Sequence, residues 1–155
     1  MRRPGVLVDA NVLLDIVTED ATWLAWSAAA VADAASRAIL VVNPIVYAEV
    51  SVQFARVEDL ERALPDDIYE RETLPWEAAF LAGKAFVDYR RRGGARRSPL
   101  PDFYLGAHAL VRGYPLLTRD AARYRTYFPR LQVIAPPPTH RGRDAGRPAP
   151  IGRIA

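Results

Sequence analysis

Four carboxylates stand where predicted strands end or predicted helices begin, and they are the residues of this sequence best suited to carry chemistry. Each lies beside an apolar run, where an unpaired charge is costly. One such acid could serve as a helix cap, but four at equivalent places suggest a shared counter-ion. A hard divalent cation such as Mg²⁺ or Mn²⁺ prefers oxygen ligands and would suit that role. The four residues are Asp9, Glu49, Asp102 and Asp120.

Ordinary structural roles stay open for two of these acids. Asp102 could be an acid favoured by the dipole at a helix N-terminus, and Asp120 could be a helix N-cap. Glu49 has neighbours that look inward, which favours a functional role. Asp9 ends a buried strand, where a structural reason is hardest to find. Asp15, by contrast, is expected on a solvated face or in an ordinary ion pair.

Strands and helices alternate along the sequence in a way that could bring the four acids together. Short apolar, β-branched segments predict buried strands, and segments with helical spacing of apolar residues predict helices. Asn43-Pro44 marks one helix start and Gly113 one helix end. The expected strands are 6–8, 39–42, 68–74, 115–118 and 131–135, and the expected helices are 10–17, 22–38, from 44 onward, 57–64, from 75 to the Arg-Arg-Arg-Gly-Gly segment at 90–94, 101–112 and 120–128.

This alternation predicts an α/β fold, a three-layer sandwich with a central, mainly parallel sheet flanked by helices. In such sheets functional sites gather at the carboxyl ends of the strands. Asp9 and Asp120 directly follow predicted strands. Glu49 and Asp102 are expected in the first turns of helices that could lead away from the same edge. We therefore expect the four acids to converge there.

Length and composition favour one domain over residues 1–135, followed by a flexible basic tail over 136–155 that is rich in proline, glycine and arginine. Hydrophobic residues make up 50% of the 155 residues, enough for a core, but no apolar run is long enough for a membrane span. The absence of cysteine excludes disulfides and thiolate metal sites, and the cytoplasm is the expected compartment. The tail holds the whole net charge of +3, so charge alone does not indicate nucleic-acid binding.

Residues 1–135 resemble a PIN domain, and specifically a VapC-like toxin of a type II toxin–antitoxin system. The resemblance implies a Mg²⁺- or Mn²⁺-dependent endoribonuclease that hydrolyses phosphodiester bonds of RNA. It also implies a homodimer and a cognate antitoxin that covers or enters the active site. No single segment is specific, and the match rests on four of them in this order and spacing. They are Val8-Asp9-Ala10-Asn11-Val12-Leu13, Tyr47-Ala48-Glu49, Asp102-Phe103-Tyr104-Leu105-Gly106-Ala107-His108-Ala109 and Leu116-Leu117-Thr118-Arg119-Asp120.

By position the four acids take the family's acidic roles as metal ligands and catalytic groups. Asp120 stands at the place that varies within the family. Asn11 and Thr118 match polar positions that support the site. Divalent ions would neutralise the anionic phosphodiester and lower the pKa of a bound water, which is what its hydrolysis needs.

Arginines near these segments are candidates for RNA contact. Arg96 and Arg97 lie in an arginine-rich loop that could clamp a phosphate, or could equally be a solvated charge run or a surface for an acidic partner. Arg119, between Thr118 and Asp120, is the third candidate. His108 is expected to be a packed residue rather than a general base.

Four other readings compete with this one. A haloacid-dehalogenase-like phosphatase needs a second aspartate two residues after the first, where this sequence has Asn11. A receiver domain needs a late lysine, but the single lysine, Lys84, falls within a predicted helix. A PIN nuclease acting in RNA maturation or on DNA fits the same residues. A non-catalytic RNA-binding PIN module is the main non-enzyme alternative, although such a module gains nothing from acids that repel phosphate.

Overall fold

A single parallel sheet forms the centre of the protein. The structure, a computed structural model, describes residues 3–94 and 99–138. The sheet has the order β3-β2-β1-β4-β5, so β1 lies in the middle with β2 on one side and β4 on the other. Its strands are β1 (Gly5–Val8), β2 (Ile39–Val42), β3 (Tyr69–Arg71), β4 (Leu116–Leu117) and β5 (Val133–Ile134).

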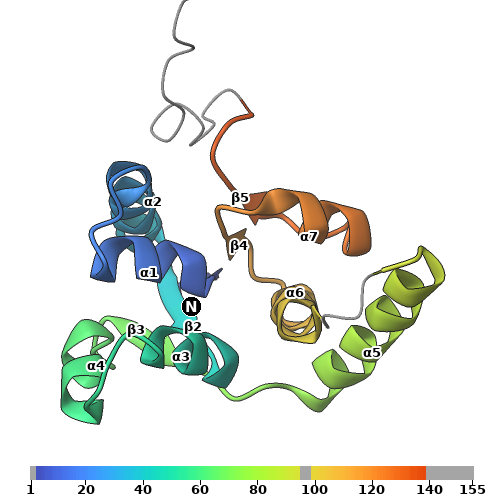
Figure 1. The fold of residues 1–155 in the computed structure, drawn as a ribbon, viewed down its shortest axis with the longest axis horizontal. Helices are drawn as coiled ribbons and strands as arrows, with labels where there is room; N and C mark the ends of the chain where they lie inside the picture. Colours follow the sequence, from blue (N-terminus) through green and yellow to red (C-terminus); the bar gives the residue numbers. More distant parts are fainter. Residues whose placement is uncertain (1–2, 95–98, 139–155) are drawn as a thin grey trace, which may run out of the picture.

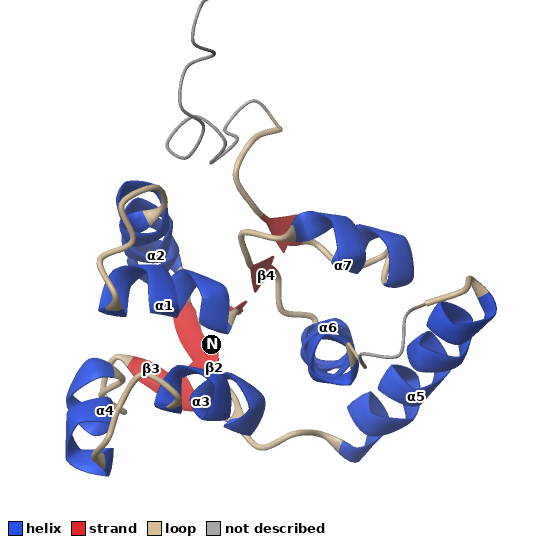
Figure 2. Cartoon of the chain, in the orientation of Figure 1, coloured by secondary structure: helices blue, strands red, loops and turns tan. Residues whose placement is uncertain are grey.

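Helices cover both faces of this sheet. In Figure 1, α1 and α2 lie on one side of the strands, and α5, α6 and α7 lie on the other. Figure 2 shows the red strands enclosed between blue helices, which confirms the predicted three-layer α/β sandwich. The helices are α1 (Ala10–Val17), α2 (Leu24–Arg37), α3 (Pro44–Ser51), α4 (Val57–Ala63), α5 (Trp76–Arg91), α6 (Leu100–Arg112) and α7 (Ala121–Tyr127).

The core lies between the sheet and these helices. The strands β1, β2 and β4 are apolar on both faces, and Leu7 of β1 and Leu116 of β4 are fully buried where the two strands pair. Phe103 of α6 packs against Tyr127 and Phe128 at the end of α7. Full burial of one such side chain contributes about 1.5–3 kcal/mol. These ring contacts fix α6 and α7 against each other, and so fix the relative positions of the acids that the two helices carry.

The predicted helix boundaries are confirmed where their end residues are specific. Asn43 caps α3, because its Oδ1 accepts a hydrogen bond from the backbone N–H of Val46 at 3.0 Å, and Pro44 takes the first helical position. Gly113 ends α6 with φ of 69°, a left-handed conformation that favours glycine. In the described part of the chain, no helix is both long and apolar enough to cross a membrane.

The two edge strands and β4 are shorter than expected, and residues 115–118 contribute only Leu116–Leu117 to β4. Residues 68–74 contribute only the three residues of β3, and 131–135 only the two of β5. Each edge strand pairs with a single neighbour, so the outer hydrogen-bonding groups of its backbone gain nothing from a longer extended segment. The part of the predicted tail from residue 139 onward lies outside the described residues.

Candidate active site

All four predicted acids line one pocket. Its volume is about 390 Å³, and it opens beyond the carboxyl ends of β1 and β4. The expected convergence of Asp9, Glu49, Asp102 and Asp120 is therefore present in the fold. The complete lining is Asp9, Ala10, Asn11, Leu14, Glu49, Val52, Gln53, Asp102, Asp120 and Tyr124.

The acids reach the pocket from four different helices. Asp9 and Asp120 occupy the N-cap positions of α1 and α7, but neither side chain makes a capping hydrogen bond. Asp102 lies in the first turn of α6, as predicted. Glu49 is the sixth residue of α3 and so lies in its second turn, not in the first turn as expected. Glu49 therefore reaches the pocket from the second half of α3, and Val52 and Gln53, just after that helix, line the same pocket.

Asp9 is buried and held by two hydroxyl groups. Its side chain is only 5% exposed. The Thr118 Oγ1 donates to Asp9 Oδ2 at 2.8 Å, and the Tyr124 hydroxyl donates to the same oxygen at 3.3 Å. Burial raises the pKa of Asp9 to about 6, and the charge of Asp102 adds to this rise, while the hydrogen bonds to the carboxylate oppose it. The carboxylate is therefore fixed in position but costly to ionise.

Glu49 and Tyr124 respond to the same negative field. Burial, together with the charges of Asp9 and Asp102, raises the pKa of Glu49 to about 7. Burial, followed by the charge of Asp9, also raises the pKa of Tyr124, which keeps its hydroxyl protonated as a donor. Tyr124 was not among the predicted site residues. Its place one helical turn after Asp120 was the available signal, because residues four apart share a helix face.

The two polar residues predicted to support the site lie next to Asp9. The pairing of Val8 with Leu117 brings Thr118 beside Asp9. Asn11 Nδ2 donates to Thr118 Oγ1 at 3.3 Å, and its Oδ1 accepts from the backbone N–H of Arg119 at 3.2 Å. These bonds tie the start of α1 to the loop between β4 and α7. The loop that carries Asp120 is therefore positioned from β1.

Asp15 is buried and forms an ion pair with Arg119, so of its two expected roles the ion pair is confirmed and the solvated face is wrong. Its Oδ2 accepts from Arg119 Nε at 2.7 Å and from Ser27 Oγ at 2.7 Å, and its Oδ1 accepts from Arg119 Nη2 at 3.0 Å. The guanidinium also lies 5.1 Å from the centre of the Trp23 ring. Because Arg119 is held in this way, an RNA contact by its side chain would have to replace or share these partners. The other two predicted arginines, Arg96 and Arg97, lie outside the described residues.

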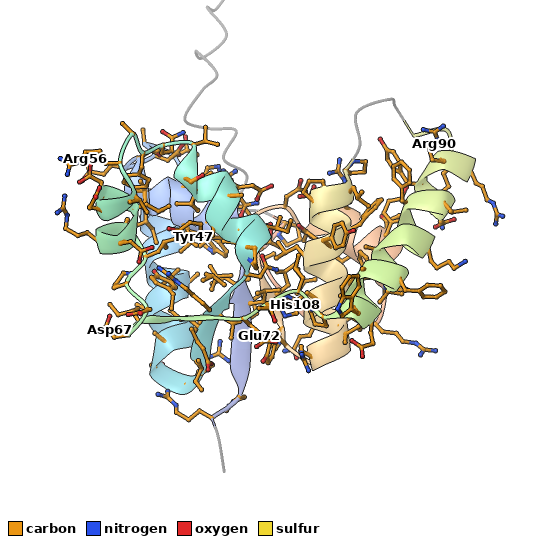
Figure 3. The ribbon with its side chains drawn as sticks, turned by 90° about the horizontal axis from the view of Figure 1, so that it is seen from below. Tyr47, Arg56, Asp67, Glu72, Arg90 and His108 are labelled. Atoms are coloured by element: carbon orange, nitrogen blue, oxygen red, sulfur yellow. The ribbon has the colours of Figure 1, made fainter. Side chains whose placement is uncertain are left out.

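His108 is a packed residue, as predicted. Its side chain is fully buried, and Nε2 lies 3.1 Å from Glu72 Oε1; Figure 3 shows the two side chains side by side. Its Nδ1 lies 3.0 Å from Nδ2 of Asn43. The Oδ1 of the same amide already accepts from the backbone N–H of Val46. The amide can only donate to Nδ1, so Nε2 carries the proton toward Glu72. This network joins α6 to the start of α3 and takes no part in lining the pocket.

An arginine that sequence reasoning missed pairs with one of the acids. Arg123 Nη1 donates to Asp102 Oδ2, with the two side chains 38% and 34% exposed. Arg123 follows Asp120 by three residues, so it projects from the same side of α7. Nothing in the local sequence pairs it with Asp102, because the two residues are 21 positions apart.

The donor set of the pocket fits a hard divalent cation. Four carboxylates and no histidine or cysteine are what Mg²⁺ and Mn²⁺ prefer, and a bound cation would offset the burial cost and the mutual repulsion that raise the pKa values of Asp9 and Glu49. Within residues 3–94 and 99–138, no three acidic, histidine or cysteine side chains are already close enough to hold an ion. Mg²⁺ keeps several waters when bound, so carboxylates that do not contact the ion directly can still hold it through those waters.

Comparison with known proteins places this fold. The sequence model of the PIN domain matches residues 6–129. The chain belongs to the PIN domain family. No curated protein sequence matches this PIN domain.

Solved structures with the same fold include toxin–antitoxin complexes. VapBC2 from Rickettsia felis, bound to a promoter DNA fragment, is 14% identical with a TM-score of 0.67 over 86% of this chain and 99% of that chain. VapBC-1 from nontypeable Haemophilus influenzae is 18% identical with a TM-score of 0.65 over 84% and 97%. A toxin–antitoxin complex from Klebsiella pneumoniae is 18% identical with a TM-score of 0.62 over 83% and 95%. At these identities the likeness shows the shared fold.

Proposed function

We propose that this PIN domain is a metal-dependent endoribonuclease that hydrolyses phosphodiester bonds of RNA, with Mg²⁺ or Mn²⁺ bound by its four acids. The observation that carries the proposal is their convergence in one pocket at the carboxyl edge of a parallel sheet. Three of the four lie at helix N-termini without capping them, so capping does not account for their positions. The nuclease unit is taken as residues 1–135, and its compartment as the cytoplasm.

The residues of the pocket have distinct parts in this chemistry. The bound cation would neutralise the phosphate and activate a water molecule. Asp9, fixed by Thr118 and Tyr124, is suited to be the central ligand, because β1 is the middle strand. Asp102 and Asp120 would hold the cation or its waters. Glu49, whose pKa of about 7 in the metal-free chain lies near neutrality, is suited to ligate or to accept a proton from the attacking water.

We further propose that the protein is the toxin of a toxin–antitoxin pair and forms a homodimer. An antitoxin partner is supported by the fold that this chain shares with VapBC complexes and with a complex described as toxin–antitoxin. A second support is the surface of α5, where Trp76 is 89% exposed and Phe80 is 70% exposed. Neighbouring large apolar side chains left in water are typical of protein interfaces.

Cleavage of a mixed RNA pool tests the nuclease. We expect cutting with Mg²⁺ or Mn²⁺, none with EDTA, and at least a ~100-fold loss in Asp9→Asn. Asp33→Asn is the matched control, because Asp33 forms an exposed ion pair with Arg37 on α2, away from the pocket. Equal cutting by the wild type and Asp9→Asn, or cutting that survives EDTA, would refute the assignment.

Growth after induced expression in bacteria tests the toxin. Wild-type protein should arrest growth, Asp9→Asn should not, and co-expression of a cognate antitoxin, sought in a small reading frame beside this gene, should restore growth. Growth arrest by both proteins would show that toxicity does not come from the pocket.

A further inference from the structure

One arginine, Arg123, forms an ion pair with an acid that lines the pocket. Arg123 of α7 bonds Asp102 of α6, and each side chain is about two-thirds buried. Arg123 is followed by Tyr124, which bonds Asp9. One turn of α7 therefore contacts two of the four acids, one through a neutral hydroxyl and the other through a cation.

Asp102 differs from the other three acids in having a cationic partner among the described residues. Within the described ranges, Asp102 is the only one of them that forms an ion pair. Asp9 and Glu49 have no cationic partner there, and both are harder to ionise than usual, with the charge of Asp102 contributing in each case. Arg123 is thus the counter-ion that the fold itself supplies to this group of acids.

A guanidinium and a metal ion compete for the same carboxylate oxygens. If Asp102 is a metal ligand, loading the pocket must displace Arg123 from Asp102 Oδ2 or weaken its hold. The displaced side chain stays charged at any physiological pH, and it stays at the rim of the pocket because α7 is anchored through Tyr124 and Phe128. A guanidinium with five N–H donors is well suited to phosphate oxygens.

We propose that Arg123 is an exchangeable counter-ion of the site, bound to Asp102 in the metal-free protein, displaced by the cation, and then bound to a phosphate of the RNA. This proposal rests on the proposed function, because it takes Asp102 as a metal ligand and RNA as the substrate. It makes two demands on one side chain: Arg123 opposes metal binding and favours RNA binding once metal is present.

Metal binding is the first test, measured by calorimetric titration of the full-length chain with Mn²⁺. Arg123→Gln should bind Mn²⁺ about fivefold more tightly than wild type, the scale of a partly exposed ion pair. Arg125→Gln is the matched control, because it removes the same charge from an exposed position on the same helix. In an Asp102→Asn background, Arg123→Gln should give no such gain, which isolates the pairwise effect.

The outcomes separate this inference from the proposed function. Tighter Mn²⁺ binding by Arg123→Gln, with no such gain in Arg125→Gln or in the Asp102→Asn background, supports the exchange. If wild type binds Mn²⁺ and Arg123→Gln binds it equally well or more weakly, the role of Arg123 is overturned and the metal site stands. Failure of every protein to bind Mn²⁺, with folding verified by circular dichroism, would overturn the proposed function and this inference with it.

RNA binding is the second test, measured against salt in a Glu49→Gln background so that the RNA is not cut. With Mn²⁺ present, Arg123→Gln should weaken RNA binding several-fold. It should also reduce the slope of log K against log salt by the amount expected for about one phosphate contact. In EDTA the same substitution should leave the slope unchanged, because Arg123 is then held by Asp102. A slope that is unchanged in Mn²⁺, or reduced equally in both conditions, would refute the exchange onto phosphate.

Discussion

Replacing Asp9 with asparagine should stabilise the metal-free protein while abolishing its activity. Burial raises the pKa of Asp9 from 3.8 to about 6. Each pKa unit corresponds to about 1.4 kcal/mol, so ionising this carboxylate in the folded chain costs roughly 3 kcal/mol. Asparagine can still accept from Thr118 and Tyr124 through its amide oxygen, but its NH₂ group cannot accept the hydrogen bond that the backbone N–H of Asn11 gives to the carboxylate. The expected net gain at about pH 8 is therefore roughly 1–3 kcal/mol.

The pH dependence follows from the direction of the shift. The folded chain binds the Asp9 proton more tightly than the unfolded chain, so the wild-type free energy of unfolding falls as pH rises from about 4 to about 6. Above about pH 6 the loss is complete. The advantage of Asp9→Asn is therefore largest at neutral and alkaline pH and nearly gone at about pH 4.

Thermal unfolding in EDTA measures this difference. Each kcal/mol corresponds to about 2–4 °C in Tm for a chain of this size, and Asp33→Asn serves as the control on an exposed ion pair. Adding Mn²⁺ should reverse the order, because a cation that binds only the folded wild type stabilises it by mass action. An Asp9→Asn variant less stable than wild type at about pH 8 in EDTA would refute the argument that burial penalises this charge.

Four further expectations concern the residues of the pocket, its supporting ion pair and the arginine-rich loop. Tyr124→Phe should weaken Mn²⁺ binding several-fold and move its pH profile upward, as calorimetry at several pH values would show, because a donor to the ionised acid after β1 is lost. Asp15→Asn should lower the free energy of unfolding in urea by about 3 kcal/mol, since it leaves a partly buried guanidinium without its charge partner. Mn²⁺ affinity measured by calorimetry should fall below about pH 7, as Glu49 takes up a proton. Replacing Arg96 and Arg97 with alanine should weaken RNA binding and flatten its salt dependence, and an unchanged slope in a filter-binding assay would exclude the phosphate clamp.

The fold was predictable because its central strands are apolar on both faces and short. Strands at 6–8 and 39–42 could only be buried parallel strands between helical segments, and the structure has them at Gly5–Val8 and Ile39–Val42. The convergence of the acids followed from the same topology, since Asp9 and Asp120 end neighbouring strands. The bounds of the edge strands were not predictable, because they depend on how much backbone one neighbour can pair.

The contacts that tune the pocket could not be read from the sequence. Asp15 looks like a surface residue of α1 until Arg119, 104 positions later, is placed over it. Tyr124 and Asp9 are 115 positions apart. Periodicity reports which face of an element is buried, but it does not report which polar group from a distant element meets it there.

The order of the sheet also bears on synthesis of the chain. A nascent chain that has emerged as far as α5 carries Asp9 and Glu49, but it lacks β4, α6 and α7, and with them Asp102 and Asp120. Until β4 arrives, β1 has no neighbour on one edge, and Asp9 has neither of its hydroxyl donors. Any activity that needs the whole pocket is therefore withheld until translation has passed α7, so fragments released early from the ribosome would be inert.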